Sequence, residues 1–202
     1  MYLHRRPDLL EAMAVAGQVL VPTLSGYYEM AGLGEVIDPS QAQATSQMPP
    51  MLAELARHNL NEGAASMRAA RSAGVKIALG SDTSLAVGLE IQRMVHHGLP
   101  PAEALVAATM TAAEALGLDD HIGTVAAGQL ADLIIVDGDP LTEPQLLSDP
   151  GRIWLVLQLG APVAGQLLAN PALAGQFTWP DQPAGPRPAD MAGWAQAGRR
   201  HG

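Results

Sequence analysis

Asp82 is the side chain of this sequence whose position best suits catalysis. It follows "KIALG", residues 76–80, a short apolar run that predicts a buried strand ending at Gly80. In parallel α/β folds, functional side chains lie at the carboxyl ends of strands, where the loops converge. Asp82 is predicted to lie at such a position.

Two interpretations of Asp82 stay open from the residues alone. A carboxylate at a strand end can bind a divalent metal ion, or take and release a proton at a metal-bound water whose pKa the cation has lowered. It can also simply cap the following turn, with help from Ser81 and Thr83.

The six histidines form no local metal-binding motif, since neither His-x-His nor His-Glu-x-x-His occurs. His96 and His97 stand about 100° apart on a predicted helix, so they cannot both face one ion. A surface position is expected for the others, which are His4, His58, His121 and His201.

The sequence lacks the motifs of several other kinds of chemistry. The phosphate-binding patterns G-x-x-x-x-G-K-[ST] and G-x-G-x-x-G are absent, so nucleotide binding has no support. No G-x-S-x-G elbow occurs, which disfavours a serine hydrolase. The chain has no cysteine, which excludes disulfides and thiolate chemistry.

Two successive helix–glycine–strand units precede Asp82. A helix is predicted over 7–16 up to Gly17, then a strand over 19–21 that ends at Pro22. A second helix over 50–73 ends at Gly74 and leads into the strand before Asp82. This order favours a parallel sheet, part of a barrel or of a doubly wound sheet.

Residues 25–48 have no sustained period and predict a long loop with room for a helical turn, whose tyrosines could contact a substrate. Two helical segments follow over 88–98 and 100–117, the second broken near Thr109 to Thr111. From Asp119 the pattern becomes strand-like, with turns at Gly123 and Gly128 and a hairpin around Gly160 to Pro162. The predicted parts are an α/β part (1–118), a β subdomain (119–168) and a flexible Pro/Gly-rich tail (169–202).

The net charge of −9 argues against nucleic acid or an anionic membrane as partner, since both need clustered Lys and Arg. No apolar stretch reaches the roughly 18 residues that cross a bilayer, and the first residues lack the apolar core of a secretion signal. A cytoplasmic protein is therefore expected.

Three segments together resemble the carboxyl-terminal half of the amidohydrolase superfamily, in particular its imidazolonepropionase-like and dipeptidase-like members. They are "GVKIALGSDTS", "LPPAEALVAATMTAAEALGL" and "DHIGTVAAGQLADLIIVDGDPL". The resemblance covers about residues 3–165. It implies an α/β fold: the last strands and helices of a partial (β/α)8 TIM-type barrel, followed by strands of a small β-sandwich subdomain.

The resemblance also implies a reaction, the hydrolysis of carbon–nitrogen bonds by a metal-activated water. Asp82 matches the acid at the end of the eighth barrel strand, which binds a divalent metal and shuttles the proton. The metal is expected to be Zn²⁺, one or two ions, and the substrate a small amide, cyclic amide or dipeptide. "QVLVPTLS" matches the seventh strand, and the expected substrate pocket consists of Pro22, Thr23, Ser25, Tyr27 and Ser81.

The other metal ligands of the superfamily cannot be placed in this sequence. They are a His-x-His, a carboxylated Lys or Glu, and two single histidines, and the chain is expected to lack them through amino-terminal truncation. We therefore expect it to be inactive alone, with a complementing amino-terminal half or a homo-oligomer as partner. The alternative is a non-catalytic fragment or one subunit of a split enzyme.

Overall fold

The computed structural model describes residues 2–41, 48–82 and 87–170 of the 202-residue chain. The chain divides into two units, Met1–Thr111 and Ala112–Gly202. Each unit is described separately below. The predicted division between residues 118 and 119 stays a prediction.

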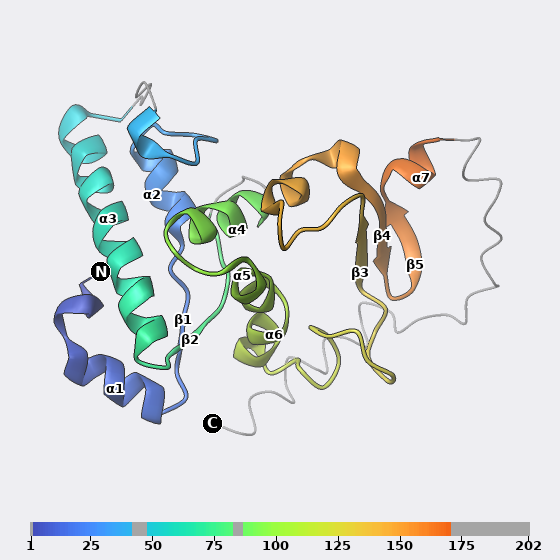
Figure 1. The fold of residues 1–202 in the computed structure, drawn as a ribbon, viewed down its shortest axis with the longest axis horizontal. Coiled ribbons are helices and arrows are strands. Elements are labelled where there is room, and N and C mark those ends of the chain that lie inside the picture. Colours follow the sequence, from blue (N-terminus) through green and yellow to red (C-terminus); the bar gives the residue numbers. More distant parts are fainter. Residues whose placement is uncertain (1, 42–47, 83–86, 171–202) are drawn as a thin grey trace. The chain divides into compact units, whose positions relative to one another are not determined.

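The first unit is mainly helical, and its long helices follow the sequence pattern closely. The helices predicted over 7–16 and 50–73 are present, and Thr109 separates α5 from α6, as expected for the second helical segment. The helical elements are η1 (Leu3–Arg5), α1 (Pro7–Val15), α2 (Leu24–Met30), η2 (Pro39–Gln41), α3 (Pro50–Ser72), α4 (Val87–His96), α5 (Pro101–Ala108) and α6 (Met110–Leu116), which spans the division (Figure 1).

Two short parallel strands connect these helices. β1 (Val19–Leu20) pairs with β2 (Lys76–Ile77), with Leu20 opposite Ile77. Gly17 and Gly74 end the preceding helices with positive φ, which glycine adopts without steric cost. The predicted parallel pairing is confirmed. The fold is mixed α/β, and across residues 2–41, 48–82 and 87–170 no closed barrel forms.

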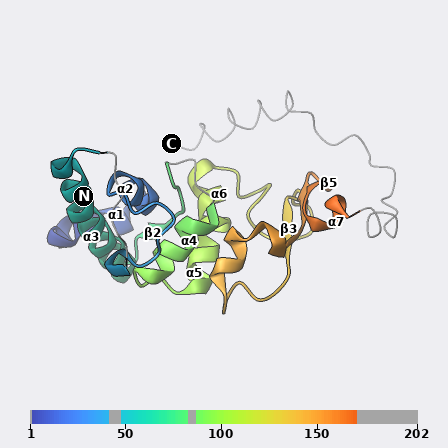
Figure 2. The ribbon, with the colours of Figure 1, turned by 90° about the horizontal axis from the view of Figure 1, so that it is seen from above.

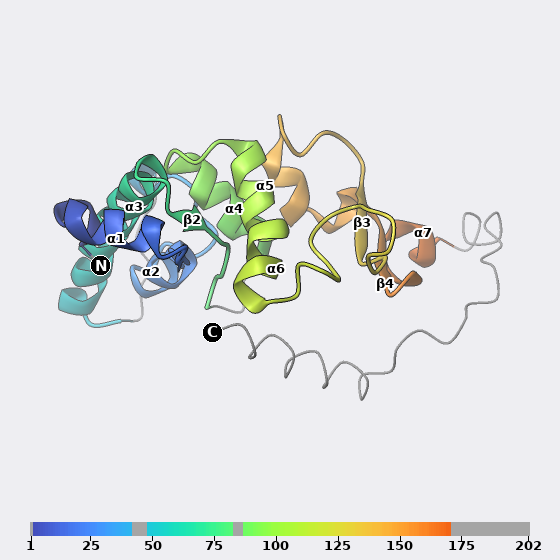
Figure 3. The ribbon, with the colours of Figure 1, turned by 90° about the horizontal axis from the view of Figure 1, so that it is seen from below.

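The chain continues beyond β2 in contact with its neighbours. The amide of Ala78 donates to the carbonyl of Leu20 at 3.0 Å, and the amide of Leu79 donates to the carbonyl of Ala107 at 2.9 Å. The α4 and α5 helices lie side by side (Figure 3). The end of β2 is thus fixed both to β1 and to α5.

The core of the first unit lies along one face of α3, which packs against α2 (Figures 1 and 2). Gly63 interrupts the strong helix formers of α3, yet the helix is continuous through it. A Cβ at Gly63 would lie 3.7 Å from side-chain atoms of Leu24 and Tyr27, so α2 approaches the helix closely here. The buried apolar residues of α3 are Ala53, Ala56, Leu60, Ala64, Met67 and Ala70.

The long loop with a helical turn, predicted over 25–48, begins with more helix than expected. α2 occupies Leu24–Met30, and η2 forms further along. The segment contains Gly26 and paired tyrosines and is too short for a clear apolar period. Its helix depends on packing against α3 and on contacts with α4, which a local pattern cannot reveal.

The second unit holds a three-stranded antiparallel sheet in the order β3–β4–β5. Its strands are β3 (Leu133–Val136), β4 (Ile153–Gln158) and β5 (Ala161–Ala164). Leu159 and Gly160, both with positive φ, turn the predicted β4–β5 hairpin, which is confirmed. Turns and bends occupy most of residues 119–132, including the predicted turn positions Gly123 and Gly128, whereas the strand-like character expected between them does not form strand. The remaining elements are η3 (Pro144–Ser148), η4 (Pro150–Arg152) and α7 (Gln166–Ala169).

None of the described helices combines the length and the apolar character needed to cross a membrane.

Gly80 packs so closely on β1 that a side chain there should destabilise the first unit. A Cβ at Gly80 would lie 2.7 Å from Cγ1 of Val21, whose β-branched side chain is stiff. We expect Gly80→Ala to lower the free energy of unfolding by about 1–3 kcal/mol, measured by urea denaturation.

Gly26→Ala is the matched control, because no atom lies within 4 Å of a Cβ at that helical glycine. It should raise the free energy of unfolding by about 0.5–1 kcal/mol through helix propensity. Equal stability of the two alanine variants would contradict the close packing of Gly80.

Candidate functional site

Asp82 lies beyond the carboxyl end of β2 with an exposed side chain. Its backbone takes the left-handed conformation, with φ of 50°. Thr23, beyond the end of β1, does the same with φ of 52°. Non-glycine residues rarely adopt this region, and a β-branched threonine is the more unusual of the two.

These two left-handed residues both follow the paired strands, but at different distances. In the register that pairs Leu20 with Ile77, Thr23 is level with Gly80, and Asp82 lies two residues further along the chain. A Cβ at Gly80 would lie 2.7 Å from Cγ1 of Val21, so the two chain segments stay close beyond the ladder. We call Thr23 and Asp82 the paired turns.

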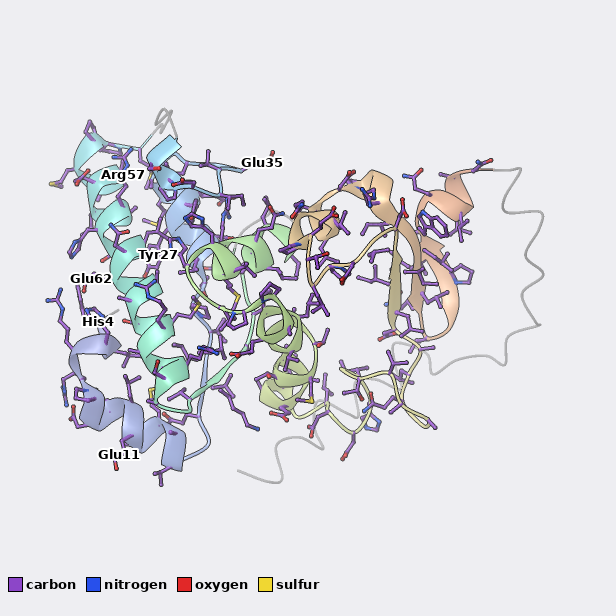
Figure 4. The ribbon with its side chains drawn as sticks, in the orientation of Figure 1. His4, Glu11, Tyr27, Glu35, Arg57 and Glu62 are labelled. Atoms are coloured by element: carbon purple, nitrogen blue, oxygen red, sulfur yellow. The ribbon has the colours of Figure 1, made fainter. Side chains whose placement is uncertain are left out.

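The structure brings most of the predicted pocket residues to these strand ends. Pro22 is buried beside half-buried Thr23, and Ser81 is half-buried beside Asp82. Tyr27 lies elsewhere: it projects from α2 toward α3, with its ring near Gly63 (Figure 4). The strand-end group is thus Pro22, Thr23, Ser81 and Asp82.

Ser25 is fully buried and belongs to a charged network that no local sequence pattern predicts. Glu90, on α4 and also fully buried, accepts hydrogen bonds from the amides of Leu24 and Ser25, each at 2.8 Å. It also accepts one from the Ser25 hydroxyl. The Glu90 carboxylate therefore caps the first turn of α2, a role that the side chain of Thr23 does not fill.

Arg93, one turn along α4, completes this network. Its Nη1 donates to the Ser25 hydroxyl at 2.6 Å, and its Nη2 donates to the carbonyl of Gly34. Its guanidinium carbon lies 4.2 Å from the centre of the Tyr28 ring, a cation–π arrangement. The serine hydroxyl thus accepts from Arg93 and donates to Glu90, which links the two buried charges.

Burial is the largest influence on the pKa values of Glu90 and Arg93. It raises the pKa of Glu90, while the donors of Ser25 and Leu24 and the charge of Arg93 oppose that rise. Burial also lowers the pKa of Arg93, and the charge of Glu90 opposes it. The two residues are i, i+3 on one helix, and in the sequence they look like ordinary polar positions of an amphipathic helix.

His97 lies at the edge of the same network. Tyr28 donates its hydroxyl to the carbonyl of Ile37 at 2.7 Å, so Nε2 of His97, 2.9 Å away, acts as donor to the tyrosine oxygen. Burial lowers the pKa of His97 to about 4, helped by the charges of His96 and Arg68. At neutral pH this imidazole is uncharged.

The amino-terminal segment is held to α3 by polar contacts around Glu62 (Figure 4). Arg5 donates to both carboxylate oxygens of Glu62, at 2.8 and 2.9 Å, and Nε2 of His4 lies 3.4 Å from the same side chain. Nδ1 of His4 is 3.2 Å from the Ser66 hydroxyl. These groups anchor the chain and do not gather around a metal position: the described residues hold no cluster of three or more potential ligands.

Two grooves in the first unit lie away from Asp82. One of about 320 Å³ is lined by residues at the amino end of β2, including Val75 and Lys76. The other, of about 620 Å³, lies between α1 and α3 and is lined by Leu10 and Ala69 among others. Neither includes a residue of the paired turns.

The parallel strand pair, followed along the chain by a small antiparallel sheet, defines a mixed α/β fold. The chain belongs to the amidohydrolase family, whose sequence model matches residues 7–163. This confirms the family indicated by the sequence.

Relatives of known name are similar to this chain over part of their own length. Imidazolonepropionase of Chloroflexus aggregans is 29% identical over 149 residues, 66% of this chain and 31% of the relative. The 5-methylthioadenosine/S-adenosylhomocysteine deaminase of Moorella thermoacetica is 35% identical over 105 residues, 44% of this chain and 23% of the relative. The chain thus spans less than a third of these relatives.

Solved structures show a similar partial match. A Xaa-Pro dipeptidase with bound methionine superposes with a TM-score of 0.65 and 27% identity, over 78% of this chain and 37% of that one. The ochratoxinase of A. niger gives a TM-score of 0.63 and 26% identity, over 78% and 35%. The fold is therefore that of one part of such proteins.

The depressed pKa of His97 predicts a loss of stability in mild acid. The unfolded chain binds a proton at this residue near pH 6.5 and the folded chain only near pH 4, so stability present above pH 6.5 is lost as the pH falls toward 4. After allowance for partial exposure, the loss should be about 2 kcal/mol.

His97→Gln tests this, because the glutamine amide can still donate to Tyr28 but does not titrate. Free energies of unfolding should be measured for both proteins at pH 7 and pH 4.5. Glu90, with its raised pKa, contributes with the opposite sign in both proteins and cancels in the comparison. The same fall in stability for both proteins would contradict the prediction.

Proposed function

We propose that this chain forms part of a metal-dependent hydrolase of carbon–nitrogen bonds, with Asp82 as metal ligand and proton shuttle. The observation that carries the proposal is the exposed carboxylate at the carboxyl end of a parallel strand, in a chain that belongs to the amidohydrolase family. In this reading β1 and β2 are the seventh and eighth strands of a (β/α)8 barrel.

The second unit fits the same reading as part of a β-sandwich. Its sheet exposes large apolar side chains, with Ile134 at 60%, Val163 at 51% and Trp154 at 46% of their surface. A three-stranded sheet with this much apolar surface favours cover by further strands. We propose that the strands of a second sheet come from elsewhere in the complete protein.

The metal requires ligands beyond those described. Zinc sites use three or four protein ligands, and Asp82 supplies one. When bound, a divalent cation lowers the pKa of a water so that hydroxide forms near neutral pH. The role of Asp82 is to take the proton of the attacking water and return it to the leaving nitrogen. We propose that a complementing amino-terminal half supplies the remaining ligands.

The substrate class follows from the relatives. The matched proteins include an imidazolonepropionase and a Xaa-Pro dipeptidase, whose names indicate a cyclic amide and a dipeptide. A small amide, cyclic amide or dipeptide is therefore proposed here, bound beside Pro22, Thr23 and Ser81. For Ser25 and Tyr27, pocket lining remains a prediction.

A second candidate function is that of one subunit of a split enzyme, or of a non-catalytic partner. It is favoured by the lack of a ligand cluster among the described residues and by the match to about a third of each relative. The non-catalytic reading differs from both enzyme readings in that hydrolysis by a complex containing this chain would not depend on Asp82.

The proposal is tested by a hydrolysis screen with added Zn²⁺. N-acylated amino acids, dipeptides and cyclic amides should be offered to the chain alone and to the chain mixed with the amino-terminal half of a related imidazolonepropionase or dipeptidase. We expect activity in the mixture. Asp82→Asn, which tolerates the left-handed backbone, should lower the rate about 100-fold or more and reduce bound zinc.

Asp8→Asn is the matched control, because Asp8 is an exposed carboxylate paired with Arg6 on α1, away from the strand ends. It should leave rate and zinc content unchanged. If Asp82→Asn keeps both the zinc and the rate of the active mixture, Asp82 does not have the proposed role. If no mixture is active, the split or non-catalytic reading gains support.

A further inference from the structure

Thr23 adopts a backbone conformation that its own side chain disfavours. At φ 52° and ψ 50° it is a β-branched residue in the left-handed region, immediately before α2. Its hydroxyl makes only a long hydrogen bond, 3.4 Å, to the carbonyl of Val21. Local contacts of Thr23 therefore do not account for the turn, and such backbone strain persists only where surrounding structure imposes it.

Here the structure that imposes the turn is the cap that the Glu90 carboxylate forms at the start of α2. The two amides that Glu90 holds, those of Leu24 and Ser25, are the first two after Thr23. Fixing these amides fixes the direction in which the chain leaves Thr23. A fully buried carboxylate is costly to desolvate, so its retention at this point suggests a task beyond packing.

Arg93 makes the cap rigid. Its bond to the Ser25 hydroxyl at 2.6 Å leaves that hydroxyl proton directed at Glu90. Its second bond, to Gly34, ties the cap to the segment beyond α2. The segment from Thr23 to Gly34 is thus held at its beginning and at its end by two residues of α4.

We propose that Glu90 and Arg93 are positioning residues that act through Ser25 to hold Thr23 in its left-handed turn, where it faces the substrate. The placement of the substrate beside Thr23 rests on the proposed function. It is supported by the positions of Thr23 and Asp82, which both follow the carboxyl ends of the paired strands β1 and β2. Ser25 serves here as a bridge between two charges.

The first test measures, in the isolated chain, how strongly Glu90 protects the amides that follow Thr23 from hydrogen exchange. Glu90→Gln should speed hydrogen exchange of the Leu24 and Ser25 amides about tenfold, and Ser25→Ala should have a smaller effect in the same direction. In a Thr23→Gly background, where the turn is unstrained, Glu90→Gln should speed exchange only about threefold. This coupling distinguishes holding a strained turn from general packing.

Two results would overturn the inference at this stage. One is unchanged exchange at Leu24 and Ser25 in both the Glu90→Gln and the Ser25→Ala proteins. The other is an equal effect of Glu90→Gln with threonine or with glycine at position 23. Neither result depends on whether the chain takes part in hydrolysis.

The second test uses the active mixture described above. Thr23→Gly should leave the unfolding midpoint unchanged or raised, since it relieves strain, yet lower kcat about tenfold at a similar zinc content. Suppose that Asp82→Asn abolishes hydrolysis while Thr23→Gly changes neither kcat nor KM. Then Thr23 does not face the substrate, and the proposed function stands. If Asp82→Asn has no effect, the proposed function fails, and the exchange experiment still decides the role of Glu90.

Discussion

The first unit depends on how a buried carboxylate satisfies the start of a short helix. α2 has seven residues, and helices of this length are not stable without tertiary contacts. Its first amides point into protein, where no solvent reaches Glu90 or Ser25. An uncapped helix start in that position would leave unpaired donors, each costing about 1–3 kcal/mol. The carboxylate of Glu90 removes this cost, and Arg93 in turn balances the charge that the cap introduces.

The same constraint links the helices to the strand ends. A two-residue parallel pair has little stability of its own and relies on the elements packed around it. Gly80 lets the two chains stay in contact beyond the ladder, and the cap then determines where the chain turns after β1. The path of the chain through Thr23 therefore depends on contacts from three separate stretches of sequence.

The sequence predicted what local patterns can encode. Glycines at helix ends and apolar runs located β1, β2 and the long α3, and Leu159–Gly160 formed the expected hairpin. The helix of Leu24–Met30 was missed because its stability comes from α3 and α4, not from its own composition. The strand before Asp82 is shorter than predicted, since β2 ends at Ile77, and the chemical role of Asp82 is not encoded in the local pattern and stays a prediction from the family.

The buried charges were missed for a related reason. Glu90 and Arg93 look like ordinary polar positions of an amphipathic helix, and only their distant partners at Ser25 and Gly34 make burial possible. Charged residues are rarely fully buried unless paired, so such a network marks a place where backbone geometry matters more than stability alone. Because the network ends at the turn that follows β1, it connects a constraint on folding with the end of the strand that pairs with β2, the strand that leads to the proposed catalytic acid.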